Sequence, residues 1–209
     1  MERSAYLYVL DTLSDWEPGY AIAELNSGRF FKERGERVSV RTVGVGREPV
    51  TTMGGVEITP EVSVSDVRPE NTAVLMLAGA DTWDEPQHDA VLQKVEELLD
   101  AGANVAAICG ATGALANAGA FDHRPHTSNS PQYLEMVAPR YRGQAHYVEA
   151  RAVADGNLIT ADSSGQLLWA KYILEQLGVF SDESLEAWYR YFDTGDAPHF
   201  FALMQSLPQ

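Results

Sequence analysis

The chain has 209 residues, of which 45% are hydrophobic, and it carries a single cysteine. Its 30 acidic and 15 basic residues give a formal net charge of -15, which would repel nucleic acid or an anionic membrane over most of the surface. No apolar run approaches the ~20 residues of a membrane-spanning helix, and the first residues show no signal-peptide pattern. We therefore expect a cytoplasmic protein with no internal disulfide and no nucleic-acid or membrane partner.

The start of the chain predicts a strand followed by a helix. Residues 6–10 form a compact apolar run that is too short for a helix and fits a buried first strand. A helix is predicted over residues 16–34, with Ser14 or Asp15 as its N-terminal cap and Gly35 as its stop signal.

The pattern of strands and helices continues through the next seventy residues. Residues 38–43 predict a second strand, and residues 73–77 predict another that is apolar throughout. Between them, residues 44–60 alternate in polarity and contain several glycines, which predicts a hairpin appended to the main sheet. Apolar residues at helical spacing predict a helix over residues 86–101, ended by Gly102.

Residues 104–117 contain the only cysteine, at a point where an apolar strand meets a helix. The strand ends at Cys109, and the following Gly110 leads into small residues that favour a helix. A sharp turn of this kind presents one side chain at the carboxyl end of a sheet, where the free N–H groups of the helix stabilise negative charge. Cys109 is therefore our candidate nucleophile; the alternative is a lone cysteine acting as a small buried apolar residue.

The second half of the chain predicts a closing hairpin and a helical tail. The expected elements are a strand-like stretch over 124–128, a helix over 131–137 capped by Ser130, a hairpin from 146–153 and 158–161, a helix over 167–177, and one or two aromatic-rich helices over 181–209. We expect one domain over residues 1–180. The segment 181–209 is expected to be a C-terminal helical extension that packs on this domain or on a dimer partner.

The alternation of apolar strands with helices predicts an α/β fold. We expect a three-layer α/β/α sandwich with a flavodoxin-like, mainly parallel sheet, a nucleophile elbow and added β-hairpins. Sites in such sheets form at the carboxyl ends of strands, next to a topological switch point. The turns at residues 14–17, 78–81 and 109–112 should meet there.

The ThiJ/PfpI superfamily has a nucleophile-elbow region that closely resembles the segment AICGATGALANAGAFDHRPHTSN. These are the class I glutamine amidotransferase-like proteins, also called the intracellular protease/amidase type. Its first strand and glutamate-bearing helix resemble YVLDTLSDWEPGYAIAEL, its Pro-Gly-Gly turn resembles LMLAGAD, and its closing hairpin resembles DGNLITADSSG. The resemblance covers residues 6–179 and implies the fold and a cysteine site, whereas residues 181–209 lie outside the common core.

The resemblance also implies roles for particular residues. Cys109 matches the nucleophilic cysteine of the superfamily, and Glu17 matches the glutamate that lies against it. Such a carboxyl should have a raised pKa and either hydrogen-bond the thiolate or carry protons, the alternative being a solvated glutamate in the first turn of a helix. The backbone N–H groups of Gly110 and of Gly79 or Ala80 are the expected oxyanion hole.

Two departures from the superfamily pattern concern histidine. PfpI-type peptidases carry a histidine directly after the cysteine, where this chain has Gly110. Glyoxalase-like members carry a histidine after two small residues; aligning Thr127 and Ser128 with these places Asn129 at that position. We therefore take His126 as the candidate catalytic base, with a surface or structural histidine as the alternative.

The remaining site residues are expected to shape a pocket without a metal or cofactor. His123 and His126 are three residues apart, which in a strand sends their side chains to opposite faces and disfavours a shared zinc ion. Trp16, Thr127 and Asn129 are the expected pocket residues, burial in the core being the alternative for the tryptophan.

We predict a cysteine-dependent hydrolase of the amidase type that acts on a small carbonyl or amide compound of unknown identity. Alternatives are a redox-sensing or chaperone-like stress protein with an oxidisable cysteine and no turnover, a glyoxalase- or deglycase-like enzyme, and a scaffold protein with an inaccessible thiol. Because most members of the superfamily are homo-oligomers, a homodimer is expected.

Overall fold

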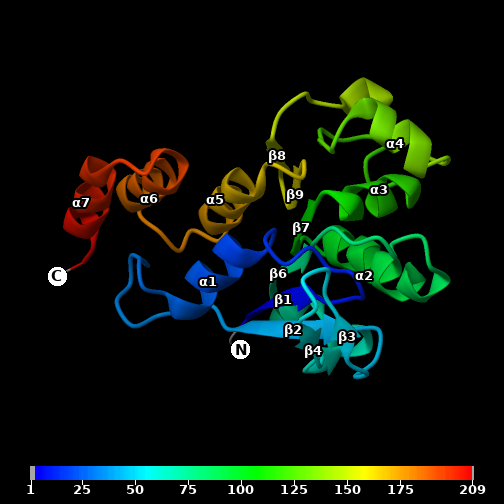
Figure 1. Cartoon of the computed structure of the whole chain (residues 1–209), viewed down its shortest axis with the longest axis horizontal. Helices are drawn as coiled ribbons and strands as arrows, with labels where there is room; N and C mark the ends of the chain where they lie inside the picture. Colours follow the sequence, from blue (N-terminus) through cyan, green and yellow to red (C-terminus); the bar gives the residue numbers. More distant parts are fainter. Residues whose placement is uncertain (1–2, 209) are drawn as a thin grey trace.

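A seven-stranded sheet lies in the middle of the computed structural model, which describes residues 3–208 (Figure 1). Its strands are β1 (Ser4–Tyr8), β2 (Val40–Gly44), β5 (Val62–Ser63), β6 (Thr72–Leu77), β7 (Asn104–Ile108), β8 (Ala152–Asp155) and β9 (Leu158–Ala161). They lie in the order β5-β2-β1-β6-β7-β9-β8, and all neighbours are parallel except the β8–β9 hairpin. The mainly parallel α/β fold expected from the sequence is confirmed.

Helices cover both faces of this sheet. The described residues form seven α-helices: α1 (Gly19–Ser27), α2 (Asp89–Asp100), α3 (Gly110–Asn117), α4 (Pro131–Val137), α5 (Gln166–Gln176), α6 (Asp182–Thr194) and α7 (Ala197–Ser206). Short 3-10 turns lie at Val64–Asp66, Pro69–Asn71, Pro86–His88 and Gln144–His146. In Figure 1, α1 and α5 lie on one side of the sheet and α2 and α3 on the other, which gives the three layers.

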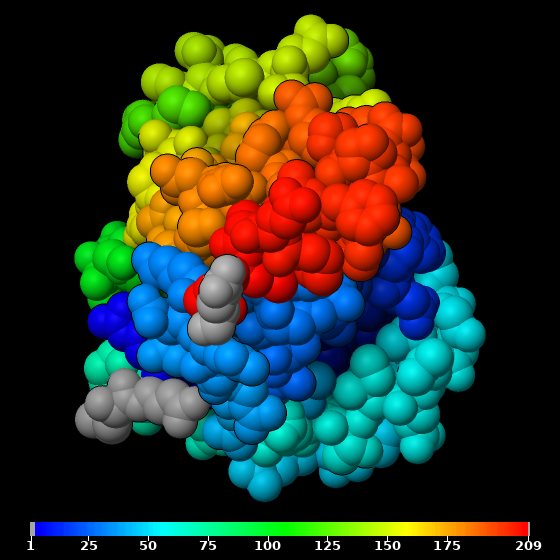
Figure 2. Space-filling view, turned by 90° about the vertical axis from the view of Figure 1, so that its left-hand side faces the viewer, coloured from blue at the N-terminus to red at the C-terminus, as the bar shows by residue number. Residues whose placement is uncertain are grey.

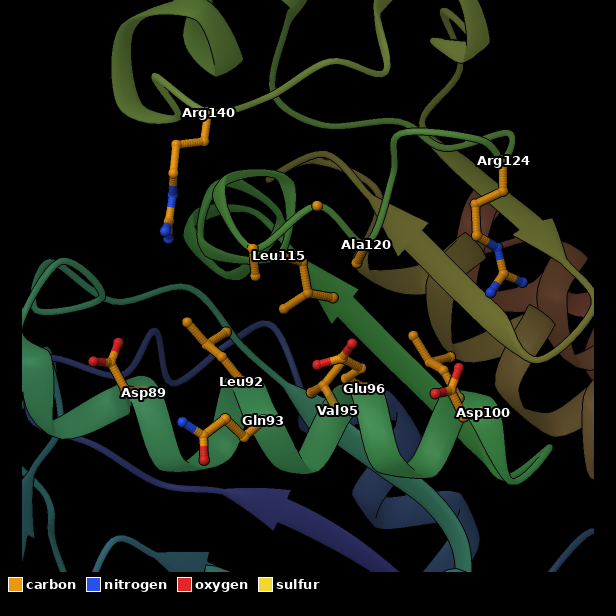
Figure 3. A pocket seen from close by; sticks show the side chains of 13 residues that line it. Asp89, Leu92, Gln93, Val95, Glu96, Asp100, Leu115, Ala120, Arg124 and Arg140 are labelled. Carbon is orange, nitrogen blue, oxygen red and sulfur yellow. The ribbon is translucent and has the colours of Figure 1, made fainter.

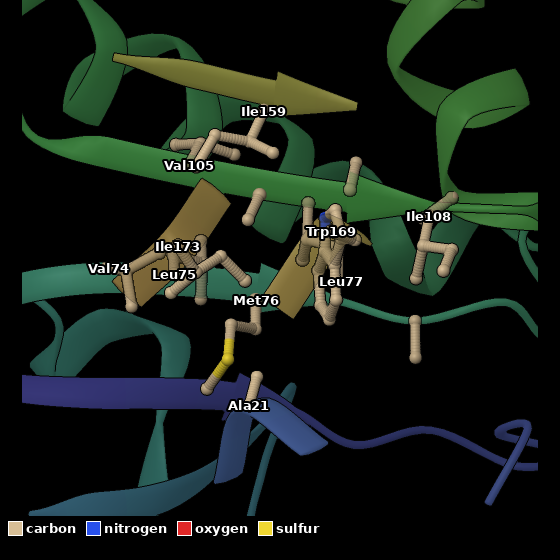
Figure 4. Close-up of a cluster of buried hydrophobic side chains, with 14 of the residues drawn as sticks. Ala21, Val74, Leu75, Met76, Leu77, Val105, Ile108, Ile159, Trp169 and Ile173 are labelled. Carbon is tan, nitrogen blue, oxygen red and sulfur yellow. The ribbon is translucent and has the colours of Figure 1, made fainter. Parts of the chain in front are cut away.

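The core lies where the central strands are buried on both faces. All six residues of β6 are buried, as are four of the five in β7, which explains why both read as continuous apolar runs. Figure 4 shows Leu75, Met76 and Leu77 of β6 in one buried cluster with Trp169 and Ile173 of α5, and these five side chains are completely shielded from solvent. This packing fixes the strand ends that carry the site.

The strand order brings three turns together at one edge of the sheet. From β1 the chain passes outward to β2 and β5, and then returns to the other side of β1 with β6. The change of direction between β1 and β6 is a topological switch point, where α/β sheets bind ligands. The turns after β1 and β6 meet here, as the Ser14 N–H to Gly79 carbonyl hydrogen bond of 2.8 Å shows, and Gly110 after β7 packs against Ala80.

The first helix is shorter than the sequence predicted. It ends at Ser27 because Gly28 adopts a left-handed conformation with φ of 59°, so the predicted stop at Gly35 is wrong. The predicted cap is also wrong, since Pro18 occupies the cap position without a side-chain hydrogen bond. Asp15 instead accepts hydrogen bonds from Thr52 Oγ1 and Gly54 N–H, at 2.5 and 2.6 Å, which attaches the following hairpin to the turn after β1.

That hairpin departs from the expectation in its connection to the sheet. It consists of β3 (Val50–Thr51) and β4 (Glu57–Ile58), which form a separate two-stranded sheet. The sequence analysis missed β5, which is only two residues long and extends the main sheet. The predicted strand at residues 146–153 is confined to β8, and the strand-like stretch at 124–128 is reduced to one bridge between His126 and Tyr147.

The aromatic tail packs on the domain through α6. The indole Nε1 of Trp188 donates to the buried Glu24 carboxylate of α1 at 3.1 Å, and the ring of Tyr20 meets those of Trp188 and Phe192 edge-on. Figure 2 shows the orange and red helices α5 to α7 side by side above the blue segment that contains α1. Among residues 3–208, no helix combines the length and apolar composition needed to cross a bilayer.

Candidate active site

Cys109 occupies a strained turn between β7 and α3. Its backbone has φ of 56° and ψ of -123°, a conformation that non-glycine residues rarely adopt. Hydrogen bonds hold it there: its N–H donates to the Ala161 carbonyl, and its own carbonyl accepts from the Thr112 N–H, both at 3.0 Å. The strand, strained cysteine and helix together form the nucleophile elbow that the sequence predicted.

Glu17 lies against this thiol and is completely buried. Its Oε2 accepts a hydrogen bond of 2.6 Å from the Gly79 N–H. A methyl group placed on Gly79 would lie 3.0 Å from both carboxyl oxygens and 3.1 Å from Cys109 Cβ, so only glycine fits between the two side chains. The structure therefore excludes the alternative of a solvated glutamate.

The surroundings of this pair favour its protonated forms. Burial raises the pKa of Glu17 above its ordinary value, although the Gly79 N–H and the thiol act in the opposite direction. Burial, followed by the charge of Glu17, raises the pKa of Cys109 to about 11. Oε1 of Glu17 has no partner at hydrogen-bond distance among the described residues, so it is available to take a proton from the neighbouring sulfur.

Asn129 approaches the sulfur from the other side. Its Nδ2 donates to Cys109 Sγ at 3.6 Å, while its Oδ1 accepts from the Ser163 N–H at 2.9 Å. Because the backbone N–H of Ser163 fixes the oxygen of the amide, the NH₂ group must face the sulfur. Asn129 can therefore stabilise a thiolate by donating a hydrogen bond, but it cannot act as a base.

The candidate oxyanion hole is narrowed from three N–H groups to two. The Gly79 N–H is occupied by Glu17, which leaves those of Gly110 and Ala80. These residues approach closely: a methyl group on Gly110 would lie 3.0 Å from the Ala80 oxygen and 3.2 Å from its nitrogen. Gly110 also lies at the N-terminus of α3, where backbone N–H groups have no partner within the helix.

The structure places His126 away from the thiol, in a separate buried cluster. Its Nδ1 hydrogen-bonds the Arg124 carbonyl at 2.9 Å and its Nε2 hydrogen-bonds the Tyr141 hydroxyl at 2.6 Å. The ring also stacks on Phe121, with 4.5 Å between centroids. Both ring nitrogens are thus occupied, and the expectation of a catalytic base at His126 gives way to a structural role.

The other two expected pocket residues differ in position. Thr127 is completely buried. Its hydroxyl donates to the Ala150 carbonyl at 2.8 Å, which holds the loop in place. Its expected pocket role is therefore replaced by a structural one. Trp16, next to Glu17, is half exposed, so the alternative of core burial does not hold for it.

The sequence analysis gave no role to the hydroxyl groups of Thr112 and Ser128, which lie next to the elbow. Thr112 Oγ1 lies 2.5 Å from the Cys109 carbonyl and 2.6 Å from Ser128 Oγ. This contact ties the loop that carries Asn129 to the elbow, and hydroxylated residues at both positions were the only available signal. Within the described part of the chain, no group of three or more His, Cys, Asp or Glu residues is arranged to hold a metal ion.

One protein family matches most of the chain. Residues 3–176 match the model of the DJ-1/PfpI family. The chain is 44% identical to "Uncharacterized protease YoaZ" of Bacillus subtilis (strain 168) over 205 residues, which is 98% of each chain.

Two solved structures show the same fold. The structure of a thiJ/pfpI family protein from Bacillus anthracis has a TM-score of 0.96 at 44% identity, with 99% of this chain and 98% of that chain covered. A DJ-1 superfamily protein from Agrobacterium tumefaciens, Atu0886, has a TM-score of 0.80 at 29% identity, with coverage of 92% and 98%. The chain belongs to the DJ-1/PfpI family.

Proposed function

We propose that the protein is a cysteine-dependent hydrolase that cleaves an amide or a related carbonyl compound. The observation that carries this proposal is the contact between the Cys109 thiol and the buried Glu17 carboxyl at a strained elbow. The name of the B. subtilis relative, an uncharacterized protease, is consistent with amide chemistry. Asn129 contacts the sulfur as a hydrogen-bond donor, so among the side-chain partners of the thiol in residues 3–208 Glu17 is the group placed to move the proton.

The first half of the reaction uses Glu17 as a base. Its Oε1 takes the thiol proton as the sulfur attacks the carbonyl carbon, which forms a C–S bond and moves an electron pair onto the carbonyl oxygen. The N–H groups of Gly110 and Ala80 stabilise that oxyanion. The intermediate then expels the amine, which takes the proton from Glu17, and an acyl group remains on Cys109.

The second half returns the enzyme to its starting state. Water attacks the thioester carbon while Glu17 takes a proton from it, and collapse of the second oxyanion breaks the C–S bond. The carboxylic acid leaves, and the proton on Glu17 returns to the sulfur. Glu17 serves as both base and acid in this scheme. Its pKa is raised and therefore lies closer to neutral pH than the pKa of an ordinary glutamate.

The same geometry weighs against a primarily redox-sensing role. Peroxide oxidises thiolates, and burial together with the charge of Glu17 raises the pKa of Cys109, which disfavours the thiolate. In the hydrolase scheme this is no obstacle, since Glu17 removes the proton only as the C–S bond forms. Mass spectrometry after mild peroxide treatment separates the two readings, because a sensor requires selective oxidation of Cys109.

The test is turnover of a panel of small amides, glyoxals and peptides by the purified protein. We expect hydrolysis of at least one amide, and loss of that activity by a factor of about 10³ or more in Cys109→Ala. His123→Ala, which changes an exposed residue, is the matched control and should retain full activity. Hydrolysis that survives in Cys109→Ala would refute the role of the thiol.

A further inference from the structure

A cavity of about 560 Å³ is lined by the two candidate oxyanion residues, Gly110 and Ala80. Trp83 and Ala114 also line it. Cavities of this size accommodate small organic ligands. A carbonyl oxygen bound by the N–H groups of Gly110 and Ala80 would direct one of the substituents of its carbon into this space.

Tyr133 connects the cavity to the helix that follows Cys109. Its hydroxyl would lie 3.4 Å from a methyl group on Gly113, which places it over the first turn of α3. Tyr133 lines the cavity together with Gly110, the residue that follows Cys109, so the cavity lies next to the elbow.

One part of the outer wall of the cavity is apolar and open to solvent. Met136 is 74% exposed, and the neighbouring Val137 is exposed as well. Both lie at the end of α4 and line the cavity. Apolar side chains that remain exposed around a cavity next to a reactive group are typical of a ligand site.

The cavity continues into a second groove. Leu92 of α2 and Arg140 line both spaces, and the second one has a volume of about 410 Å³. Figure 3 shows Leu92 of α2 and Leu115 of α3 in this groove, together with charged side chains that include Glu96. A bound group longer than the first cavity therefore has a second groove into which it extends.

We propose that this cavity binds a neutral, apolar group, aromatic or branched aliphatic, carried by the reacting carbonyl carbon of the substrate. The proposal rests on the thiol chemistry proposed above and adds the class of acyl group that the protein accepts. The exposed rim contains three carboxylates, Asp81, Asp84 and Asp89, against the single guanidinium of Arg140. This balance disfavours an acyl group that carries a negative charge.

The experiment measures alkylation of Cys109, which does not require turnover. Chloroacetone is compared with chloromethyl ketones that carry a phenylethyl or a carboxyethyl group in place of its methyl group. The sulfur displaces chloride in each case, and intact-protein mass spectrometry gives the rate, which is divided by the rate with glutathione. We expect a preference of about tenfold for the phenylethyl compound over chloroacetone and none for the carboxyethyl compound.

Variants locate the preference in the cavity. Ala114→Leu fills the space and should bring the preference close to one. Met136→Ala alters an exposed wall residue without a folding cost and should lower the preference by about threefold. Ala197→Leu, the same change as the first at an exposed position on α7, should have no effect.

Each outcome bears on a different proposal. A preference near one in the unaltered protein, a preference that survives in Ala114→Leu, or a thiol that no ketone labels would overturn the cavity proposal. Selective labelling without hydrolysis of any amide would uphold the cavity and refute the hydrolase. Hydrolysis of amides with no preference for apolar acyl groups would do the reverse.

Discussion

One loop contributes residues to two buried polar clusters, His126 to the first and Asn129 to the second. The two clusters are organised in opposite ways. In the cluster around His126, both ring nitrogens have hydrogen-bond partners at 2.9 and 2.6 Å. In the cluster around Cys109, the backbone is strained and Oε1 of Glu17 has no partner at hydrogen-bond distance within residues 3–208. Asn129 belongs to the second cluster, although it follows His126 by three residues.

The difference distinguishes a group that stabilises the fold from one that is available for chemistry. Leaving a buried carboxyl oxygen without a partner costs free energy of folding. Residues that retain such a cost are often found at active sites, where the substrate or the reaction supplies the missing interaction. Both ring nitrogens of His126 already have hydrogen-bond partners, and burial lowers its pKa, so His126 is not free to take up a proton in the same way.

The largest effect on activity is expected from Glu17→Gln. This change keeps the shape of the side chain and removes its ability to accept a proton. We expect kcat/KM for the best amide to fall by about 10² or more, because no other group is placed to accept the thiol proton. Steady-state kinetics give this value. A loss smaller than about threefold would show that the carboxyl is not the base.

The pH profile provides a second check on the same residue. The unaltered protein needs ionised Glu17, so kcat/KM should rise with pH through an apparent pKa above that of an ordinary glutamate. This acid limb should be absent from the residual activity of Glu17→Gln. Retention of the limb in the variant would assign it to a different group.

Stability should change in the opposite direction from activity. Because the folded-state pKa of Glu17 is raised, folding favours its protonated form, and this stabilisation is lost as pH rises from the ordinary pKa of glutamate through the raised one. Glu17→Gln should therefore have a higher Tm than the unaltered protein at pH 7. The gain should shrink toward zero below about pH 4. Thermal unfolding at both pH values tests the sign, and a lower Tm at pH 7 would contradict it.

Asn129→Ala should have a smaller effect on activity. It removes one hydrogen bond to the thiolate, which is worth about tenfold in kcat/KM, and it leaves Glu17 in place. The pKa of Cys109 should rise further, since the amide donor lowers it. Iodoacetamide alkylation across pH reports this shift directly. An unchanged alkylation profile would show that the contact has no influence on the sulfur.

Local sequence signals were sufficient where a structure depends on neighbouring residues. The apolar strand, Cys109 and Gly110 predicted the elbow, and the alternation of strands and helices predicted the turns that meet there. Ser130 predicted the start of α4, where its side chain accepts from the Tyr133 N–H. Each of these features is decided within a few residues of the chain.

Local sequence signals were not sufficient where contacts with distant segments determine the structure. Both Gly28 and Gly35 are helix stop signals, and the choice between them is made by the loop that returns past Gly28, since a methyl group there would overlap the Glu36 carbonyl. The orientation of Asn129 depends on the Ser163 N–H, and the role of His126 depends on Tyr141, neither of which is a neighbour in sequence. Tertiary hydrogen bonds of this kind leave no periodic pattern in the sequence from which they could be predicted.

The smallest effect on activity should come from Tyr141→Phe, which tests the other half of the comparison. The change removes the partner of His126 Nε2 and leaves that buried nitrogen unsatisfied, at a cost of about 1–3 kcal/mol. Denaturant unfolding should show this loss, while kcat/KM stays within about twofold because the cluster does not touch the thiol. Tyr133→Phe, the same substitution beside the thiol, is the matched control: it should have little effect on stability. A loss of activity in Tyr141→Phe that is out of proportion to the loss of stability would mean that the two clusters are coupled, and His126 would return as a catalytic candidate.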